Sequence, residues 1–94
     1  MIKLDENKLF TPEGDFEWKG LTRITMMPRD RITLHDIYYK FEFGKKHTIL
    51  YEDVEGVGDV ISKVVLALPN LKLDVFDKIW KAKITTGDYI IYEK

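Results

Sequence analysis

Residues 51–59, Tyr-Glu-Asp-Val-Glu-Gly-Val-Gly-Asp, look more like a metal-binding or catalytic loop than any other stretch of the chain does. They hold four carboxylates and two glycines in nine positions, a composition that suits calcium binding. An EF-hand loop needs glycine at its sixth position and a bidentate glutamate at its twelfth. With Gly56 in the sixth place the twelfth residue is Ser62, and with Gly58 there it is Val64. Neither register supplies the glutamate, so no calcium site is predicted.

The same stretch suits the start of a helix. The first turn of a helix has unsatisfied N–H groups and partial positive charge, which nearby carboxylates stabilise. Glu55 or Asp59 can serve in this way, and Gly56 and Gly58 let the chain turn sharply. We therefore predict a junction between a strand and a helix.

The remaining candidates for catalysis or metal binding are carboxylates and histidines. Glu52 and Asp53 are adjacent, so on an extended strand they point to opposite faces and do not form a paired-carboxylate site. His35 and His47, with Asp36 as a third ligand, lack cysteines to complete a structural zinc site. We interpret both histidines as surface residues, and we predict no catalytic residue, no metal site and no cofactor.

Composition narrows the functional class. The 94 residues are 45% hydrophobic and 33% charged, which predicts one folded domain over residues 1–94. Fifteen basic and sixteen acidic residues give a net charge of −1, so nucleic acid is not a predicted partner. The chain has no cysteine, its N-terminus has no signal-peptide pattern, and its apolar runs are too short to span a bilayer. We predict a cytoplasmic protein that does not insert into membranes.

The apolar spacing predicts strands first and helices second. Short strands are expected around residues 2–4 and 9–10, then a segment over 16–21 that fits either a strand or one helical turn. A strand over 22–27 is expected to end at Pro28. Residues 32–43 alternate with period two and should form a hairpin with 47–51.

Two helical stripes follow the hairpin. Apolar residues recur at helical spacing over 57–68, ending before Pro69, and again over 73–80, and residues 89–92 form a last strand. The predicted fold is α+β: an antiparallel sheet of about five or six strands, with two C-terminal helices packed on one face and a short final strand.

Aromatic residues suggest two binding surfaces. Tyr38 falls on the polar face of its strand, where with Lys40 and Glu42 it predicts a protein-binding surface. A pocket between sheet and helices would instead be lined by the aromatic residues Trp18, Tyr39 and Trp80.

The order of fold-forming residues also carries a resemblance. The pattern runs Phe16-x-Trp18-x-x-Leu21, the hairpin glycine Gly44, Tyr51-Glu52-Asp53-x-x-Gly56, Leu68-Pro69, Trp80 and Ile91-Tyr92-Glu93-Lys94. It resembles a group of small uncharacterised bacterial proteins with the order Trp, Glu-Asp-x-x-Gly, Leu-Pro and Trp. It is also loosely similar to pleckstrin-homology-like domains and to immunity proteins of toxin systems, although a simple pleckstrin-like domain ends in one helix. The resemblance brings no catalytic residue with it.

Three functional hypotheses follow. The first is a non-catalytic module that binds a protein partner, of immunity or regulatory type, with self-association left open. The second is a pleckstrin-homology-like domain that binds a small molecule or lipid. The third is an enzyme that uses Glu52 or Asp53 with His35 or His47, which requires one of these pairs to lie within hydrogen-bonding reach.

Overall fold

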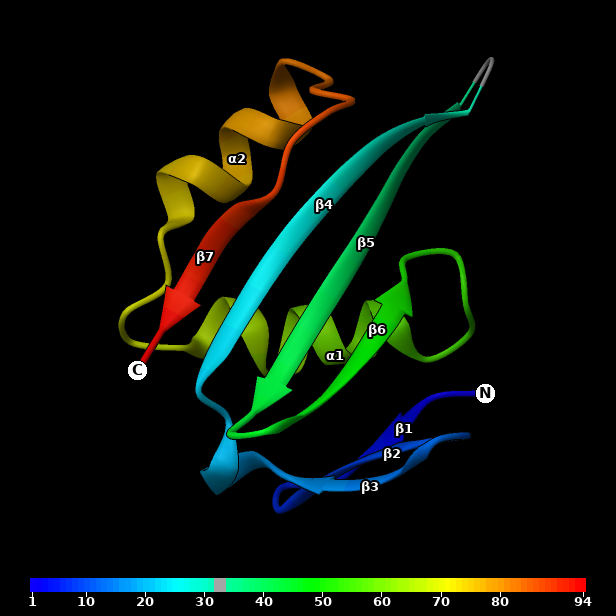
Figure 1. The fold of residues 1–94 in the computed structure, drawn as a ribbon, viewed down its shortest axis with the longest axis vertical. Coiled ribbons are helices and arrows are strands. Elements are labelled where there is room, and N and C mark those ends of the chain that lie inside the picture. The colour runs from blue at the N-terminus through cyan, green and yellow to red at the C-terminus, as the bar shows by residue number, and fades with distance from the viewer. Residues whose placement is uncertain (32–33) are drawn as a thin grey trace.

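The computed structural model describes residues 1–31 and 34–94, which form seven strands and two α-helices. Strands β1 (Lys3–Leu4), β2 (Lys8–Thr11) and β3 (Gly14–Glu17) make a three-stranded antiparallel sheet (Figure 1). Strands β4 (Arg23–Arg31), β5 (Leu34–Phe43), β6 (Lys46–Tyr51) and β7 (Tyr89–Glu93) make a four-stranded antiparallel sheet in the order β6-β5-β4-β7. The helical elements are α1 (Val57–Lys63), α2 (Leu73–Lys81) and the 3₁₀ turns η1 (Trp18–Gly20) and η2 (Val65–Ala67).

The α+β class, the two helices and the final strand after α2 confirm the prediction from sequence. The strands of the described residues are divided between two sheets, which apolar spacing did not indicate. The division occurs at η1. There the Trp18 N–H donates to the Asn7 carbonyl at 2.9 Å and the Leu21 N–H donates to the Trp18 carbonyl at 3.0 Å. These bonds turn the chain, so β3 does not continue into β4.

Strand β4 continues through Pro28, so the prediction that Pro28 ends this strand was wrong. Pro28 lies opposite Ile37 in the β4–β5 pair. The N–H and the C=O of Ile37 both form hydrogen bonds with Glu52, so both groups point toward β6 and away from Pro28. The Pro28 nitrogen consequently faces the β7 side of the strand, where pairing has already ended at Met26 and Tyr89. A missing donor costs little there. Residues 32–33 of the predicted hairpin lie outside the described residues.

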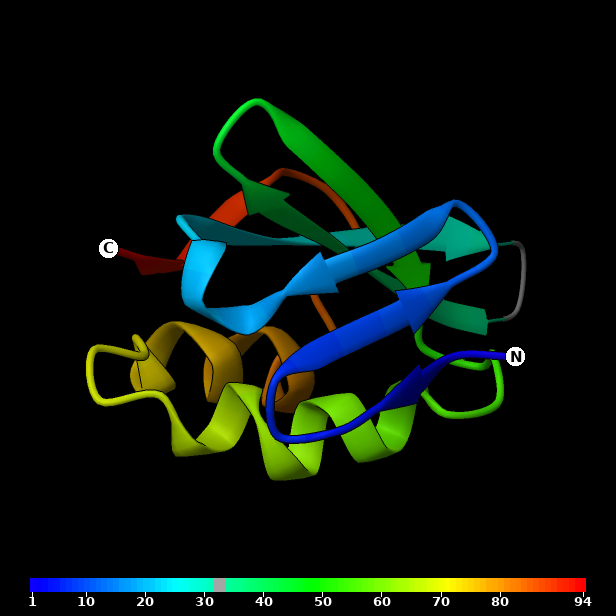
Figure 2. The ribbon, with the colours of Figure 1, turned by 90° about the horizontal axis from the view of Figure 1, so that it is seen from below.

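The four-stranded sheet has one covered and one open face. Helices α1 and α2 both lie on the same face, and no other element of the described residues covers the opposite face (Figures 1 and 2). The three-stranded sheet closes the end of the core beside α1 (Figure 2). Its β2–β3 turn is joined to β6 by a hydrogen bond in which Thr48 Oγ1 donates to Glu13 Oε1 at 2.9 Å. No helix in the described residues has the length and apolar character needed to cross a membrane.

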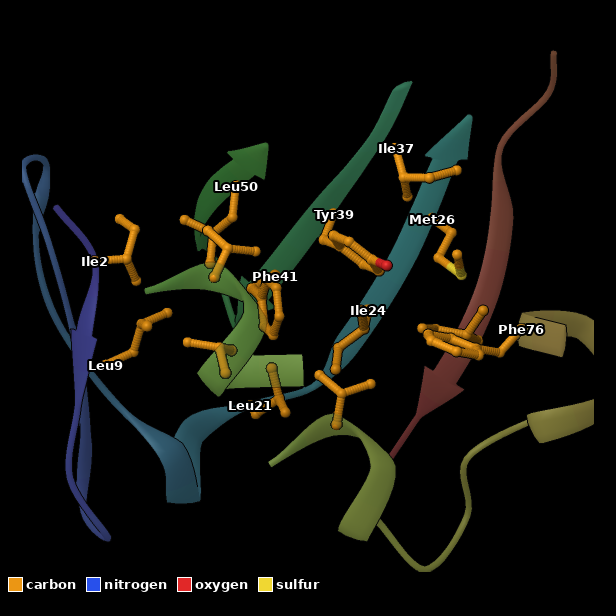
Figure 3. Close-up of a cluster of buried hydrophobic side chains, with 14 of the residues drawn as sticks. Ile2, Leu9, Leu21, Ile24, Met26, Ile37, Tyr39, Phe41, Leu50 and Phe76 are labelled. Carbon is orange, nitrogen blue, oxygen red and sulfur yellow. The ribbon is translucent and has the colours of Figure 1, made fainter. Parts of the chain in front are cut away.

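The core draws side chains from both sheets and both helices. Figure 3 shows Ile2, which precedes β1, and Leu9 of β2 pointing toward the same interior as Phe41 of β5. Trp18 packs its ring edge-on against Phe41, with the ring centroids 6.3 Å apart. The inward residues of β4 and β5 are fully or almost fully buried: Ile24, Met26, Ile37, Tyr39 and Phe41.

The junction over residues 51–59 is confirmed as the entry to a helix, since α1 begins at Val57. Gly56 has a φ of +96°, a left-handed conformation that favours glycine. The stripe predicted over 57–68 is not one continuous α-helix, because α1 ends at Lys63 and η2 follows. Leu68 is extended, as expected for a residue that precedes proline.

Candidate functional site

A cavity of about 370 Å³ lies between the helix-covered face of the four-stranded sheet and the two helices. Its volume is within the range of about 300–1,000 Å³ that small-molecule sites occupy. Each layer contributes to the wall, which is largely apolar. The lining residues are Tyr39, Glu52, Val57, Gly58, Ile61, Ser62, Leu66, Phe76 and Trp80.

The elements around the cavity hold its aromatic rings in place. Tyr39 is on the inward face of β5 and is 1% exposed, and its ring points from the sheet into the interior (Figure 3). Phe76 and Trp80 are four residues apart on α2 and so share one face of that helix. Leu66 and Trp80 are 47% and 37% exposed, which places the opening of the cavity beside them.

Glu52 supplies the carboxylate of this cavity. It follows β6 directly, and its Oε1 accepts a hydrogen bond from the Ile37 N–H at 3.1 Å. Burial raises the pKa of Glu52. The bond from Ile37 and the nearby His35 oppose this rise, whereas the charges of Asp53 and Asp36 add to it. The cavity therefore contains a partly desolvated acid whose protonation is sensitive to what binds beside it.

The Tyr39 hydroxyl is the second polar group of the cavity. Burial and the neighbouring Glu52 charge raise the pKa of Tyr39, and a hydrogen bond with the Trp80 side chain opposes that rise. The indole N–H of Trp80 can only donate, so in that bond the Tyr39 oxygen accepts. Tyr39 therefore keeps its proton at neutral pH and can donate it to a ligand.

Asp53 is not among the residues that line the cavity, and it follows Glu52 in the turn after β6 and not on the extended strand that was expected. The Tyr51 hydroxyl lies 2.7 Å from Asp36 Oδ1 and 2.9 Å from Asp53 Oδ2. Its single proton can be donated to one carboxylate at a time, and the hydrogen bonds to Asp36 and Asp53 raise the pKa of Tyr51. The Tyr51 ring stacks on Tyr38 with centroids 4.9 Å apart, so this group belongs to the open face of the sheet.

The two histidines lie far apart, His35 near the start of β5 and His47 in β6 beside the other end of β5. His35 Nε2 bonds to the Ile84 carbonyl, which fixes Nε2 as the protonated nitrogen, and its ring packs edge-on against Trp80 at 5.7 Å. His47 is exposed and pairs with Glu42 at the other end of the strand. Within the described ranges no hydrogen bond joins either histidine to Glu52 or Asp53, and no three potential metal ligands cluster.

Tyr38, Lys40 and Glu42 share the open face of β5, opposite to buried Tyr39 and Phe41. The charges on this face pair with each other. Lys40 Nζ lies 3.8 Å from Glu42 Oε1, and Arg23 contacts Glu42 at 3.7 Å and Glu93 at 2.7 Å. Tyr38 is accompanied on this face by three apolar or aromatic residues that the sequence pattern did not indicate: Tyr51, Ile49 and Ile90.

Trp18 does not share the cavity of Tyr39 and Trp80. It lines a separate cavity of about 500 Å³, between the N-terminal strands and the end of α1. Two of the polar groups in this region bond to the protein itself: the Trp18 indole donates to the Asp5 carbonyl at 3.1 Å, and Asp5 Oδ1 accepts from the Asn7 and Lys8 amides at 2.8 Å. The lining of this larger cavity includes the charged side chains of Glu6 and Lys63, and it does not include Glu52 or Tyr39.

Glu52 should make stability depend on pH. Because burial raises its pKa, the folded state keeps this proton at pH values where the unfolded chain has released it. Stability then falls as the pH rises from the ordinary glutamate range through the raised pKa. We expect Glu52→Gln to have a higher Tm than the wild type at about pH 7.5, and this difference to shrink toward about pH 4.

Thermal unfolding followed by circular dichroism at several pH values measures this difference. Glu55→Gln removes an exposed carboxylate from the same loop and controls for the change in net charge. A wild type that is more stable than Glu52→Gln at neutral pH would show that burial does not penalise this charge.

Comparisons of the chain with protein-family models, with curated proteins and with solved structures gave no match.

Proposed function

We propose that the chain is a non-catalytic binding domain and that it holds a small, mainly apolar molecule in the cavity between the sheet and helices α1 and α2. The observation that carries the proposal is the combination of an apolar wall with a few polar groups, among them the Glu52 carboxylate and the Tyr39 hydroxyl. Small-molecule sites have this composition, because apolar surface provides affinity and a few polar groups fix orientation.

Access to the cavity supports the proposal. The exposed apolar side chains Leu66 and Trp80 border it, so a ligand can enter without unfolding the core. Apolar surface in contact with water is unfavourable, and a bound ligand that covers it removes this unfavourable contact.

The test uses N-phenyl-1-naphthylamine, a neutral apolar fluorophore whose emission rises when it leaves water. We expect saturable binding by the wild type, because the probe can bury its rings against Phe76 and Trp80. Ser62 lines the cavity from an exposed position of α1, so Ser62→Phe should fill the space without disturbing the core. Ser62→Ala is the matched control and should bind like the wild type.

Two results would contradict this function. One is the absence of any saturable fluorescence rise in the wild type. The other is equal binding by the wild type and by folded Ser62→Phe, which would place the probe elsewhere on the surface.

A second candidate function is binding of a protein partner by the open face of the four-stranded sheet. The observation that favours it is the stacked pair Tyr38 and Tyr51, flanked by Ile49 and Ile90, which are 48% and 37% exposed. Tyrosine and apolar residues at the centre of a patch with paired charges around it are typical of interfaces. Because the charges pair internally, a partner would contact the aromatic centre with a complementary apolar surface.

Tyr38→Ala tests this second candidate in affinity capture from the native lysate, with Lys45→Ala in the exposed hairpin turn as control. We expect one protein to be captured by the wild type and the control and lost with Tyr38→Ala. Capture that does not depend on Tyr38 would reject this face as the interface.

A further inference from the structure

We propose that the cavity selects an amphiphilic amine, holding its protonated head group against Glu52 and its apolar part among the rings of Tyr39, Phe76 and Trp80. This inference rests on the proposed function, because it names the ligand class of the same cavity. It follows from the charge, the hydrogen bonds and the aromatic rings around Glu52.

The charge of the cavity wall comes from Glu52. The lining residues contributed by α1, η2 and α2 carry no charge, and Tyr39 keeps its proton. Of the charged groups that act on Glu52, Asp53 and Asp36 are also acidic, and His35 opposes them. The local potential is therefore negative, which attracts a cation and repels a carboxylate or phosphate.

The Glu52 carboxylate has room for another donor. Among the described residues, the Ile37 N–H is the hydrogen-bond donor to this carboxylate, and it uses Oε1. A carboxylate has about four lone-pair positions, so Oε2 can accept from an ammonium group. Such a charge-assisted hydrogen bond is about twice as strong as one between neutral groups.

The aromatic rings favour the same ligand. Tyr39, Phe76 and Trp80 line the cavity together with Glu52. Ring faces attract cations through their quadrupoles, most strongly when water is excluded, and an alkyl chain can bury its surface on the same rings. An alcohol of equal length would use the rings but not the charge.

The experiment displaces N-phenyl-1-naphthylamine with three eight-carbon compounds: octylamine, octanol and octanoate. We expect octylamine to bind about 10- to 100-fold more tightly than octanol at neutral pH, the difference that a hydrogen bond to a charged group provides. Octanoate should bind more weakly than octanol. In Glu52→Gln the preference for the amine should disappear, while the affinity for octanol should stay within about threefold of wild type.

The pH profile separates ligand binding by Glu52 from a merely structural role. Octylamine, whose ammonium group resembles that of lysine, stays protonated below about pH 9, so its affinity should fall as the pH drops through the pKa of Glu52 in the free protein. The affinity for octanol should not change over this pH range. In Glu52→Gln the affinity for octylamine should no longer depend on pH in this range.

The outcomes distinguish this inference from the function on which it rests. If octanol or octanoate binds as tightly as octylamine while Ser62→Phe still blocks the fluorophore, the cavity binds ligands but the assignment to amines is wrong. If the fluorophore does not bind the wild type, both proposals fail.

Discussion

Gly56→Ala should destabilise the protein by about 3–5 kcal/mol, a large part of the stability of a domain of this size. Gly56 has a φ of +96°, which costs a residue with a Cβ about 1–2 kcal/mol. A Cβ at this position would also lie 1.8 Å from the Ile2 carbonyl oxygen and 2.7 Å from its carbon. These are backbone atoms, so no rotamer change relieves the contact.

The N-terminal segment must then move away from α1. The Ile2 N–H donates to the Glu55 carbonyl at 3.0 Å, and the Ile2 side chain is 5% exposed. Displacing Ile2 loses this hydrogen bond and about 1.5–3 kcal/mol of apolar burial. Urea unfolding at equilibrium measures the loss as a lower midpoint.

Gly58→Ala is the matched control, two residues away in the same loop-to-helix junction. A Cβ there meets no atom within 4 Å, and the residue lies in the first turn of α1. Alanine should be neutral or should stabilise the protein by up to about 1 kcal/mol, because it restricts the unfolded chain.

Gly56→Asn separates the two causes, since asparagine tolerates left-handed backbone better than alanine does. A midpoint as low as that of Gly56→Ala would identify the contact with Ile2 as the dominant cause. A wild-type midpoint for both variants would contradict the close approach of this loop to the N-terminus.

The glycine pair illustrates what could and could not be predicted from the sequence. The change from period-two to period-3.6 spacing near Val57 is a local property, so the position of the junction could be predicted. The difference between Gly56 and Gly58 depends on Ile2, more than fifty residues away, and no local pattern contains it.

Pro28 shows the same limit for strands. Proline is a sound local signal for the end of a strand, yet here its missing donor lies on a side where no strand remains to be bonded. The absence of a bonding strand there depends on where β7 begins, some sixty residues later in the chain.

The candidate site could be predicted only in part, because it also depends on strand register, which is not a local property of the sequence. The alternation of β5 placed Tyr38 and Tyr39 on opposite faces, and helical spacing placed Trp80 toward the sheet. Glu52 joins Tyr39 in the cavity because the register of β6 sets it beside Ile37, and apolar spacing does not fix a register.

Phe41→Ala should cost about 3–5 kcal/mol, the range for truncating a fully buried phenylalanine. Phe41 is 0% exposed near the end of β5, between Ile24 of β4 and Thr48 of β6. Its ring contacts Trp18, which follows β3 directly, so it connects the core of the four-stranded sheet with the small sheet.

Ile49→Ala is the control on the neighbouring strand. Ile49 is 48% exposed on the open face of the sheet, and its truncation should cost less than about 1 kcal/mol. Equal losses for the two variants would mean that Phe41 does not lie in the core.

Hydrogen exchange in Phe41→Ala tests how far the core extends. Ile2 and Leu9 share one apolar cluster with Phe41 (Figure 3), so the two sheets should unfold as one cooperative unit. Amides of β2 and β3 should then lose protection by the same free energy as amides of β5. If β2 and β3 kept their wild-type protection, the small sheet would be an independent unit. In that case the clash between Gly56→Ala and Ile2 would destabilise the N-terminal strands without destabilising the four-stranded sheet.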